Sequence, residues 1–112
     1  MVSWNNLDTL ASFKELANVK PACLTEVMSG DSGADRVKKY SIPMAAGLSY
    51  NYASKQVDED VLSALEKLAD EAQLADKFKA LYNGEVVNTG EKRLVLHHMT
   101  RGQLGDAVEA DG

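Results

Sequence analysis

Residues 58–84, "DEDVLSALEKLADEAQLADKFKALYNG", decide the fold class because their apolar positions recur at helical spacing. The first stripe of apolar side chains consists of Val61, Leu62, Leu65, Leu68, Ala69 and Ala72. The second stripe consists of Leu74, Phe78, Leu81 and Tyr82. At about 100° per residue, the centre of the second stripe is rotated by roughly 150° from the first. One straight helix cannot bury both stripes, so the sequence predicts two helices, 58–72 and 74–83, separated by a break.

Short local signals mark the ends of these two helices. Asp58 is a good N-cap for the first helix, because its carboxylate can accept a hydrogen bond from a free backbone N–H of the first turn. Asn83 and Gly84 are expected to end the second helix, since both residue types tolerate the left-handed backbone of a helix C-terminus.

Upstream of these helices, the sequence predicts two further helices and a hairpin. Residues 5–18 carry a broad apolar stripe and are the first expected helix, and residues 22–29 are a short second one. The stretch "GDSGADR" at 30–36 is predicted to be a polar loop, because its glycines suit turns. Residues 36–53 combine β-forming side chains with the turn "PMAAG", which indicates a small hairpin with Pro43 at its edge or end.

Composition restricts the class of protein. The chain has 112 residues, of which 45% are hydrophobic and 26% charged, values typical of one modest soluble domain. The net charge of −5 argues against general binding of nucleic acid or anionic membranes. No apolar run is long enough to span a bilayer, and the single cysteine excludes an intrachain disulfide. A reducing cytoplasm is the expected compartment.

The stretch "EVVNTGEKRLVL" at 85–96 admits two structures. Two β-prone arms around "NTGE" would form a hairpin. Alternatively, Asn88 caps a helix and Glu91 completes a capping box. On such a helix Arg93, His97 and Arg101 would share one face, which could bind an anion or could be ordinary surface engaged in salt bridges. The pattern alone does not separate the two structures.

Conventional catalytic and metal motifs are absent from the sequence. It contains no P-loop and no G-x-G-x-x-G, and one cysteine with two adjacent histidines does not supply the four ligands of a zinc site. Cys23 is expected to be buried or inert, because nothing in the sequence places a histidine base beside it. His98 is expected to be a packing or surface residue.

Residues 88–101 resemble the N-terminal motif of the glucose-6-phosphate isomerase family, Asn-x-Thr-Glu-x-Arg-x-Val-Leu-His-x-x-Leu-Arg. The positions that match are Asn88, Glu91, Arg93, Val95, Leu96, His97 and Arg101. The motif's threonine is replaced by Gly90 and its second leucine by Thr100. "NGEVVN" at 83–88 and "YASKQVDEDVLSALEKLADEAQL" at 52–74 resemble neighbouring segments of the family. The leading helix and "LTEVMSGDSGADRVKKYSI" at 24–42 lie in the expected order, so the resemblance covers nearly the whole chain.

This resemblance carries expectations about structure. In the family the motif begins a helix, which favours a helix over 90–101. The fold class it implies is a mainly α segment with a small β-hairpin. That segment would be the N-terminal part of an α/β enzyme of the sugar-isomerase (SIS) type, whose catalytic domains are absent from this chain.

It also implies a function. Enzymes of the family interconvert glucose 6-phosphate and fructose 6-phosphate in glycolysis and gluconeogenesis, in the cytoplasm, as homodimers and without a metal or organic cofactor. The sugar phosphate would bind through the absent domains, so this chain is expected to hold no catalytic residue and to be inactive alone. Arg93 is the candidate for the active-site shell, and Asn88, Glu91, His97 and Arg101 are the candidates that support the motif.

A different class of function remains open at this point. The chain could be a small helical module that docks a partner protein through an exposed apolar stripe and performs no catalysis.

Overall fold

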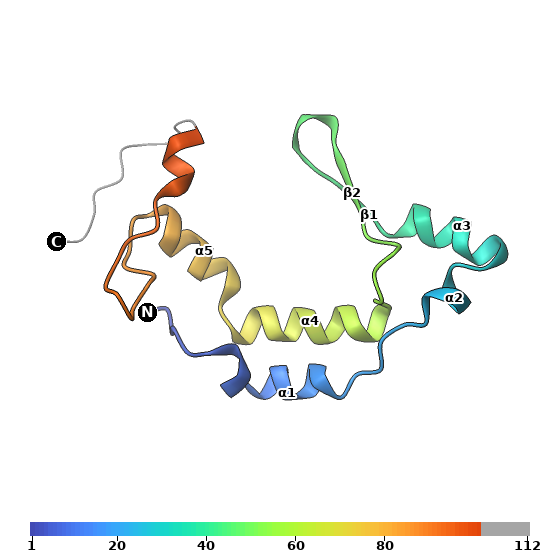
Figure 1. The fold of residues 1–112 in the computed structure, drawn as a ribbon, viewed down its shortest axis with the longest axis horizontal. Helices are drawn as coiled ribbons and strands as arrows, with labels where there is room; N and C mark the ends of the chain where they lie inside the picture. The colour runs from blue at the N-terminus through green and yellow to red at the C-terminus, as the bar shows by residue number, and fades with distance from the viewer. Residues whose placement is uncertain (102–112) are drawn as a thin grey trace. The chain divides into compact units, whose positions relative to one another are not determined.

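The computed structural model describes residues 1–101, which are mainly helical and contain one two-stranded antiparallel hairpin (Figure 1). This confirms the predicted fold class of the chain. The chain divides into two compact units, one formed by Leu16–Leu65 and the other by Met1–Glu15 together with the segment from Glu66 onward. Each unit is described by itself below. No helix in residues 1–101 has the length and apolar character needed to cross a membrane.

The unit Leu16–Leu65 contains the hairpin and the helices next to it in sequence. Strand β1 pairs with β2 in the register Ser41↔Asn51, Ile42↔Tyr50 and Pro43↔Ser49, so Pro43 lies in the last pair before the turn. The chain reverses through Ala46 and Gly47, whose φ angles of 59° and 72° are left-handed. The elements of this unit are α2 (Leu24–Val27), α3 (Gly30–Lys39), β1 (Ser41–Pro43), η2 (Ala45–Gly47), β2 (Ser49–Asn51) and the first part of α4 (Glu59–Glu71).

The prediction of a polar loop at 30–36 is wrong, because helix α3 begins at Gly30. Gly30 has a φ of 61°, which allows the chain to turn sharply out of α2. A Cβ at Gly33 would collide with the backbone of Met28, so only glycine permits this close approach. Arg36, in the next turn of the helix, is buried and hydrogen-bonded to a distant segment. Tertiary contact thus stabilises a helix that the local sequence disfavours.

The second unit contains a helix whose start the sequence misplaced. Residues 5–18 do not form one helix, because Leu10 is extended between η1 and α1. Helix α1 begins at Ala11, where the Glu71 carboxylate accepts hydrogen bonds from the Ala11 and Ser12 N–H groups. The elements that lie wholly or partly in this unit are η1 (Leu7–Thr9), α1 (Ala11–Ala17), the end of α4, α5 (Leu74–Tyr82) and η3 (His97–Arg101).

The break between α4 and α5 confirms the prediction from the two opposed stripes. Gln73 is left-handed, with φ 55° and ψ 42°, and its side-chain Oε1 accepts a hydrogen bond from the Ser3 N–H at 2.8 Å. At the other end of α4, Asp58 Oδ1 accepts a hydrogen bond from the Val61 N–H at 3.0 Å, the contact expected of an N-cap. Helix α5 stops at Asn83, followed by Gly84 with a φ of 77°.

The buried apolar residues of the described chain are alanines, with Tyr40 as the one large side chain among them. They are Ala22, Tyr40, Ala53, Ala64, Ala72 and Ala80. Large apolar side chains such as Ile42, Leu48 and Phe78 are exposed instead. Much apolar surface of the described residues is therefore uncovered. Burial of large side chains supplies most hydrophobic stabilisation, and these side chains supply little of it here.

Candidate functional site

The residues that sequence reasoning selected begin in a tight turn. Asn88 N–H donates to the Arg93 carbonyl at 3.2 Å, and Arg93 N–H donates to the Asn88 carbonyl at 3.1 Å, which forms an antiparallel bridge. Lys92, just before Arg93, has a left-handed φ of 54° that returns the chain toward Asn88. The predicted helix over 90–101 is therefore wrong in its first half, and the helical part is the 3-10 segment η3.

Asn88 and Glu91 nevertheless make the contacts expected of a capping pair. Asn88 Oδ1 accepts a hydrogen bond from the Glu91 N–H at 3.2 Å, and Asn88 Nδ2 donates to Glu91 Oε2 at 3.4 Å. A side chain that binds the N–H three residues later can start a helix or close a turn. Here it closes a turn, because the left-handed Lys92 interrupts any helical continuation.

Arg93 is a surface cation paired with one acid. Its Nη1 lies 3.6 Å from Glu91 Oε2, and its side chain is 75% exposed. An exposed pair of this kind contributes at most about 1 kcal/mol to stability. The forked guanidinium can also bind two oxygens of an anion, such as a carboxylate or a phosphate. Arg93 can thus bind an anionic ligand that approaches from outside this turn.

His97 does not share a helix with Arg93. His97 begins η3 and is exposed, and its carbonyl accepts a hydrogen bond from Thr100 Oγ1 at 2.8 Å. Arg101 ends η3, and its side chain lies outside the described part of the structure. The single cationic face expected of a helix through Arg93 and His97 is replaced by a turn and a separate 3-10 helix.

His98 confirms the expectation of a packing residue. Its ring stacks on Tyr82 of α5, with centroids 4.2 Å apart, and Tyr82 in turn contacts Phe78 at 4.8 Å. The two ring nitrogens of His98 are enclosed without a hydrogen-bond partner in the described residues. The stack connects the end of the motif to α5.

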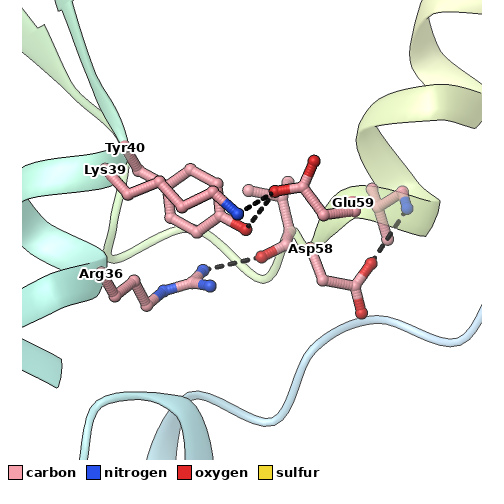
Figure 2. A network of polar contacts seen from close by, with 7 residues as sticks. Arg36, Lys39, Tyr40, Asp58 and Glu59 are labelled. Carbon is pink, nitrogen blue, oxygen red and sulfur yellow. Dashed lines mark hydrogen bonds and ion pairs between the residues drawn. The ribbon is translucent and has the colours of Figure 1, made fainter. Parts of the chain in front are cut away.

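Sequence reasoning missed a second cluster, in which Arg36 is the central residue (Figure 2). Its Nε donates to the Ala53 carbonyl at 2.8 Å, and its Nη2 donates to the carbonyls of Lys55 at 2.9 Å and Val57 at 2.7 Å. The guanidinium carbon also lies 4.4 Å from the centre of the Tyr40 ring. One buried side chain of α3 therefore holds the segment that connects β2 to α4.

The same cluster has an exposed rim, seen beside Arg36 in Figure 2. Lys39 Nζ lies 2.7 Å from Glu59 Oε1, and the Tyr40 hydroxyl donates to the same oxygen at 3.2 Å. The hydrogen bond and charge of Lys39 lower the pKa of Glu59, and the hydrogen bond and charge of Glu59 raise the pKa of Lys39. The four-residue spacing of Arg36 and Tyr40, which places neighbouring side chains together at the end of a helix, is a sequence signal for this cluster.

The side chains of these clusters make contacts that stabilise the fold. The Arg36 cluster binds backbone carbonyls and presents no nucleophile paired with a base. Within residues 1–101, no group of three or more His, Cys, Asp or Glu side chains is arranged to hold a metal ion. Cys23, expected to be buried or inert, is exposed, so the first of these two alternatives is wrong.

Comparison with known proteins identifies the family. Residues 51–112 match the family model described as phosphoglucose isomerase. The chain therefore belongs to the phosphoglucose isomerase family. The matched region begins at Asn51, the last residue of β2, and includes α4, α5 and the whole Asn88–Arg101 motif.

Curated relatives agree with this assignment. The chain is 42% identical to a glucose-6-phosphate isomerase of Treponema denticola, across 99% of this chain and 22% of the relative. It is 46% identical to that of Treponema pallidum (strain Nichols), across 89% and 19%, and 44% identical to that of Borreliella afzelii, across 99% and 20%. The chain thus spans about a fifth of the length of these relatives. Nothing in the comparisons supports the alternative of an interaction module without catalysis.

Proposed function

We propose that this chain is the N-terminal portion of an enzyme that interconverts glucose 6-phosphate and fructose 6-phosphate. The observation that carries the proposal is the 42% identity with the enzyme of that name in Treponema denticola, which extends over 99% of the chain. The Asn88–Arg101 motif adds a match at seven defined positions. The enzyme is an aldose–ketose isomerase of glycolysis and gluconeogenesis, and it acts in the cytoplasm.

The reaction requires groups that lie in the rest of such an enzyme. Ring opening is followed by proton transfer between C1 and C2, by a carboxylate base, through a cis-enediol intermediate. Binding the remote phosphate positions the reacting carbon against the base. We place the base and the phosphate site in α/β domains of the sugar-isomerase type, which assemble as a homodimer.

Within this chain, Arg93 is the proposed contributor to the active-site shell. Its guanidinium is exposed and has one acidic neighbour, so it is accessible to a further anion. The Asn88–Arg93 bridge and the Asn88–Glu91 hydrogen bonds fix the backbone that carries it. A fixed guanidinium at the wall of the site would stabilise charge that develops on the enediolate oxygen, or would hold a water molecule there.

Two assays test the proposal. The full-length polypeptide that contains this sequence should convert fructose 6-phosphate to glucose 6-phosphate, measured by a coupled assay of the product. This chain alone should give no more conversion than a buffer blank. A full-length polypeptide without isomerase activity would overturn the function. Activity of this chain alone would show that a base lies among its own carboxylates.

A further inference from the structure

Asn83 and Gly84 form the only Asn–Gly pair in the sequence, and they lie at the C-terminal end of α5. The Asn83 side chain is exposed. Glycine has no Cβ, so its backbone nitrogen can approach the side-chain carbonyl of a preceding asparagine without obstruction. The other asparagines are followed by residues that carry a side chain; they are Asn5, Asn6, Asn18, Asn51 and Asn88.

The backbone of the Asn–Gly pair is fixed by the cap of α5. The Gly84 N–H donates to the Leu81 carbonyl at 3.3 Å, and the Glu85 N–H donates to the Ala80 carbonyl at 3.0 Å. Gly84 is buried and left-handed, with a φ of 77°. Two hydrogen bonds in this pattern around a left-handed glycine are a Schellman motif. The Gly84 nitrogen is therefore engaged in the cap while α5 keeps its native end.

The same geometry keeps this nitrogen away from the Asn83 side chain. The ψ angle of Asn83 is −1°, at which the Gly84 nitrogen eclipses the backbone nitrogen of Asn83 and not its Cβ. A bond between the Gly84 nitrogen and Asn83 Cγ requires a large rotation about the Cα–C bond of Asn83. That rotation moves Gly84 out of the cap and breaks its hydrogen bond. The two groups can therefore react only while the end of α5 is locally open.

We propose that Asn83 is a site of spontaneous deamidation whose rate is controlled by the opening of this cap. In the open state the Gly84 nitrogen bonds to Asn83 Cγ, and the Cγ–Nδ2 bond breaks. The side-chain amide leaves as ammonia, which takes up the proton that the Gly84 nitrogen loses. Water then opens the resulting succinimide at one of its two carbonyls and leaves aspartate or isoaspartate at position 83. The inference does not depend on the proposed catalytic function.

Either product weakens the cap that controls its formation. The new carboxylate lies at the C-terminus of α5, where the helix dipole disfavours negative charge. In isoaspartate the main chain runs through Cβ and Cγ, which adds one atom to the backbone between Tyr82 and Gly84. The hydrogen bonds of the Schellman motif then lose their register. The modification is thus a permanent mark of a chain whose α5 has opened.

Peptide mapping of the full-length polypeptide tests the site. One sample is incubated at mildly alkaline pH in its native state, and another in urea. Trypsin releases residues 80–92 as one peptide, which carries Asn88 as an internal control. In urea we expect Asn83 to react at least about tenfold faster than Asn88, because the β-branched Thr89 obstructs the attack there. In the native state the reaction at Asn83 should be slower than in urea by at least about tenfold.

Hydrogen exchange tests the control by the cap. The exchange of the Gly84 and Glu85 N–H groups measures the fraction of chains in which the cap is open. We expect their protection to match the slowing of deamidation in the native state to within about threefold, since both need the same opening. Asn83→Gln is the control variant, because its longer side chain must close a larger ring. It should show no modification at position 83 over the same time.

Three outcomes would overturn the proposal. The first is equal rates at Asn83 and Asn88 in urea, which would deny the pair its reactivity. The second is an equal rate at Asn83 in urea and in the native state, which would remove the protection by the cap. The third is a slowing that departs from the hydrogen-exchange protection by more than about threefold, which would show that another motion controls the reaction.

Discussion

The Glu71 carboxylate at the end of α4 accepts a hydrogen bond from the Ser12 backbone N–H at 2.8 Å, and its other oxygen accepts one from Ala11 N–H at 3.3 Å. A residue 59 positions away in sequence therefore supplies the N-terminal cap of α1. The Ser12 hydroxyl and the backbone N–H groups of Ser12 and Ala11 lower the pKa of Glu71. The Ser12 hydroxyl is buried and makes no well-aligned hydrogen bond with the described residues.

Replacing this carboxylate should loosen α1. Glu71→Gln keeps the shape of the side chain but leaves one acceptor oxygen and no charge for two N–H groups. We expect the Tm to fall by a few degrees. Glu66→Gln, on the same helix and exposed, is the control and should have little effect. An unchanged Tm for Glu71→Gln would show that water replaces this cap without cost.

The cap also predicts a loss of stability in acid. Folding lowers the Glu71 pKa below its ordinary value of 4.5. The stability that the charged Glu71 adds is therefore fully present above that pH. The contribution disappears as the pH falls through the lower pKa of the folded state. Chemical denaturation of wild type and Glu71→Gln over this range should give midpoints that converge toward low pH. A constant difference between the two midpoints at every pH would contradict this prediction.

Arg36→Lys should destabilise the unit Leu16–Leu65 even though it keeps the positive charge. The ammonium group lacks the planar fork that reaches the carbonyls of Ala53, Lys55 and Val57, so part of this buried set loses its donor. We expect a loss of about 2–3 kcal/mol in the free energy of unfolding, measured in urea. Lys38→Arg, on the exposed side of the same helix, is the control. Equal midpoints for wild type and Arg36→Lys would refute the role of Arg36.

The ion pair of Lys39 and Glu59 should contribute to the free energy of unfolding only within a defined pH window. The raised pKa of Lys39 means that its contribution is present below 10.5 and is lost as pH rises through the folded value. The lowered pKa of Glu59 means that its contribution is present above 4.5 and is lost as pH falls through the folded value. Both side chains are exposed, so 1 M salt should weaken the pair. A double-mutant cycle with Lys39→Met and Glu59→Gln, measured at low and high salt, checks this. A coupling that salt leaves unchanged would contradict it.

Arg93→Ala in the full-length polypeptide should lower kcat by about ten- to a thousand-fold, with a smaller effect on substrate binding. Its exposed position implies little cost in stability. Glu91→Gln removes the ionic partner of Arg93 and keeps the guanidinium, so it should retain most of the turnover. Turnover and denaturation midpoint are measured together for both variants. Full turnover by Arg93→Ala would overturn its proposed place in the active-site shell.

His98→Phe should preserve or increase stability. Phenylalanine can maintain the stack on Tyr82 and removes two ring nitrogens that are enclosed without partners in the described residues. His98→Ala loses the stack and should cost about 1–3 kcal/mol. Thermal unfolding of the two variants distinguishes these effects. A loss for His98→Phe as large as that for His98→Ala would show that the nitrogens have a partner.

The sequence alone determined the features that depend on short-range periodicity. The stripes on either side of Gln73 differ in phase, and a helix with one buried face cannot accommodate both, so a break was required. Alternating β-forming residues around the "PMAAG" turn likewise predicted the hairpin. The resemblance of seven positions from Asn88 to Arg101 to the family's motif indicated the family, independently of the local backbone.

Only the tertiary structure decided where weak or ambiguous segments would become helical. "GDSGADR" forms α3 because Arg36 binds three carbonyls of a segment 17 to 21 residues away. Helix α1 starts at Ala11 because of Glu71, and Asn88 closes a turn rather than a helix because the chain returns to pair Arg93 with it. Local propensities differ by only about 1 kcal/mol between such alternatives. A few hydrogen bonds from residues remote in sequence exceed that difference, and no local pattern encodes them.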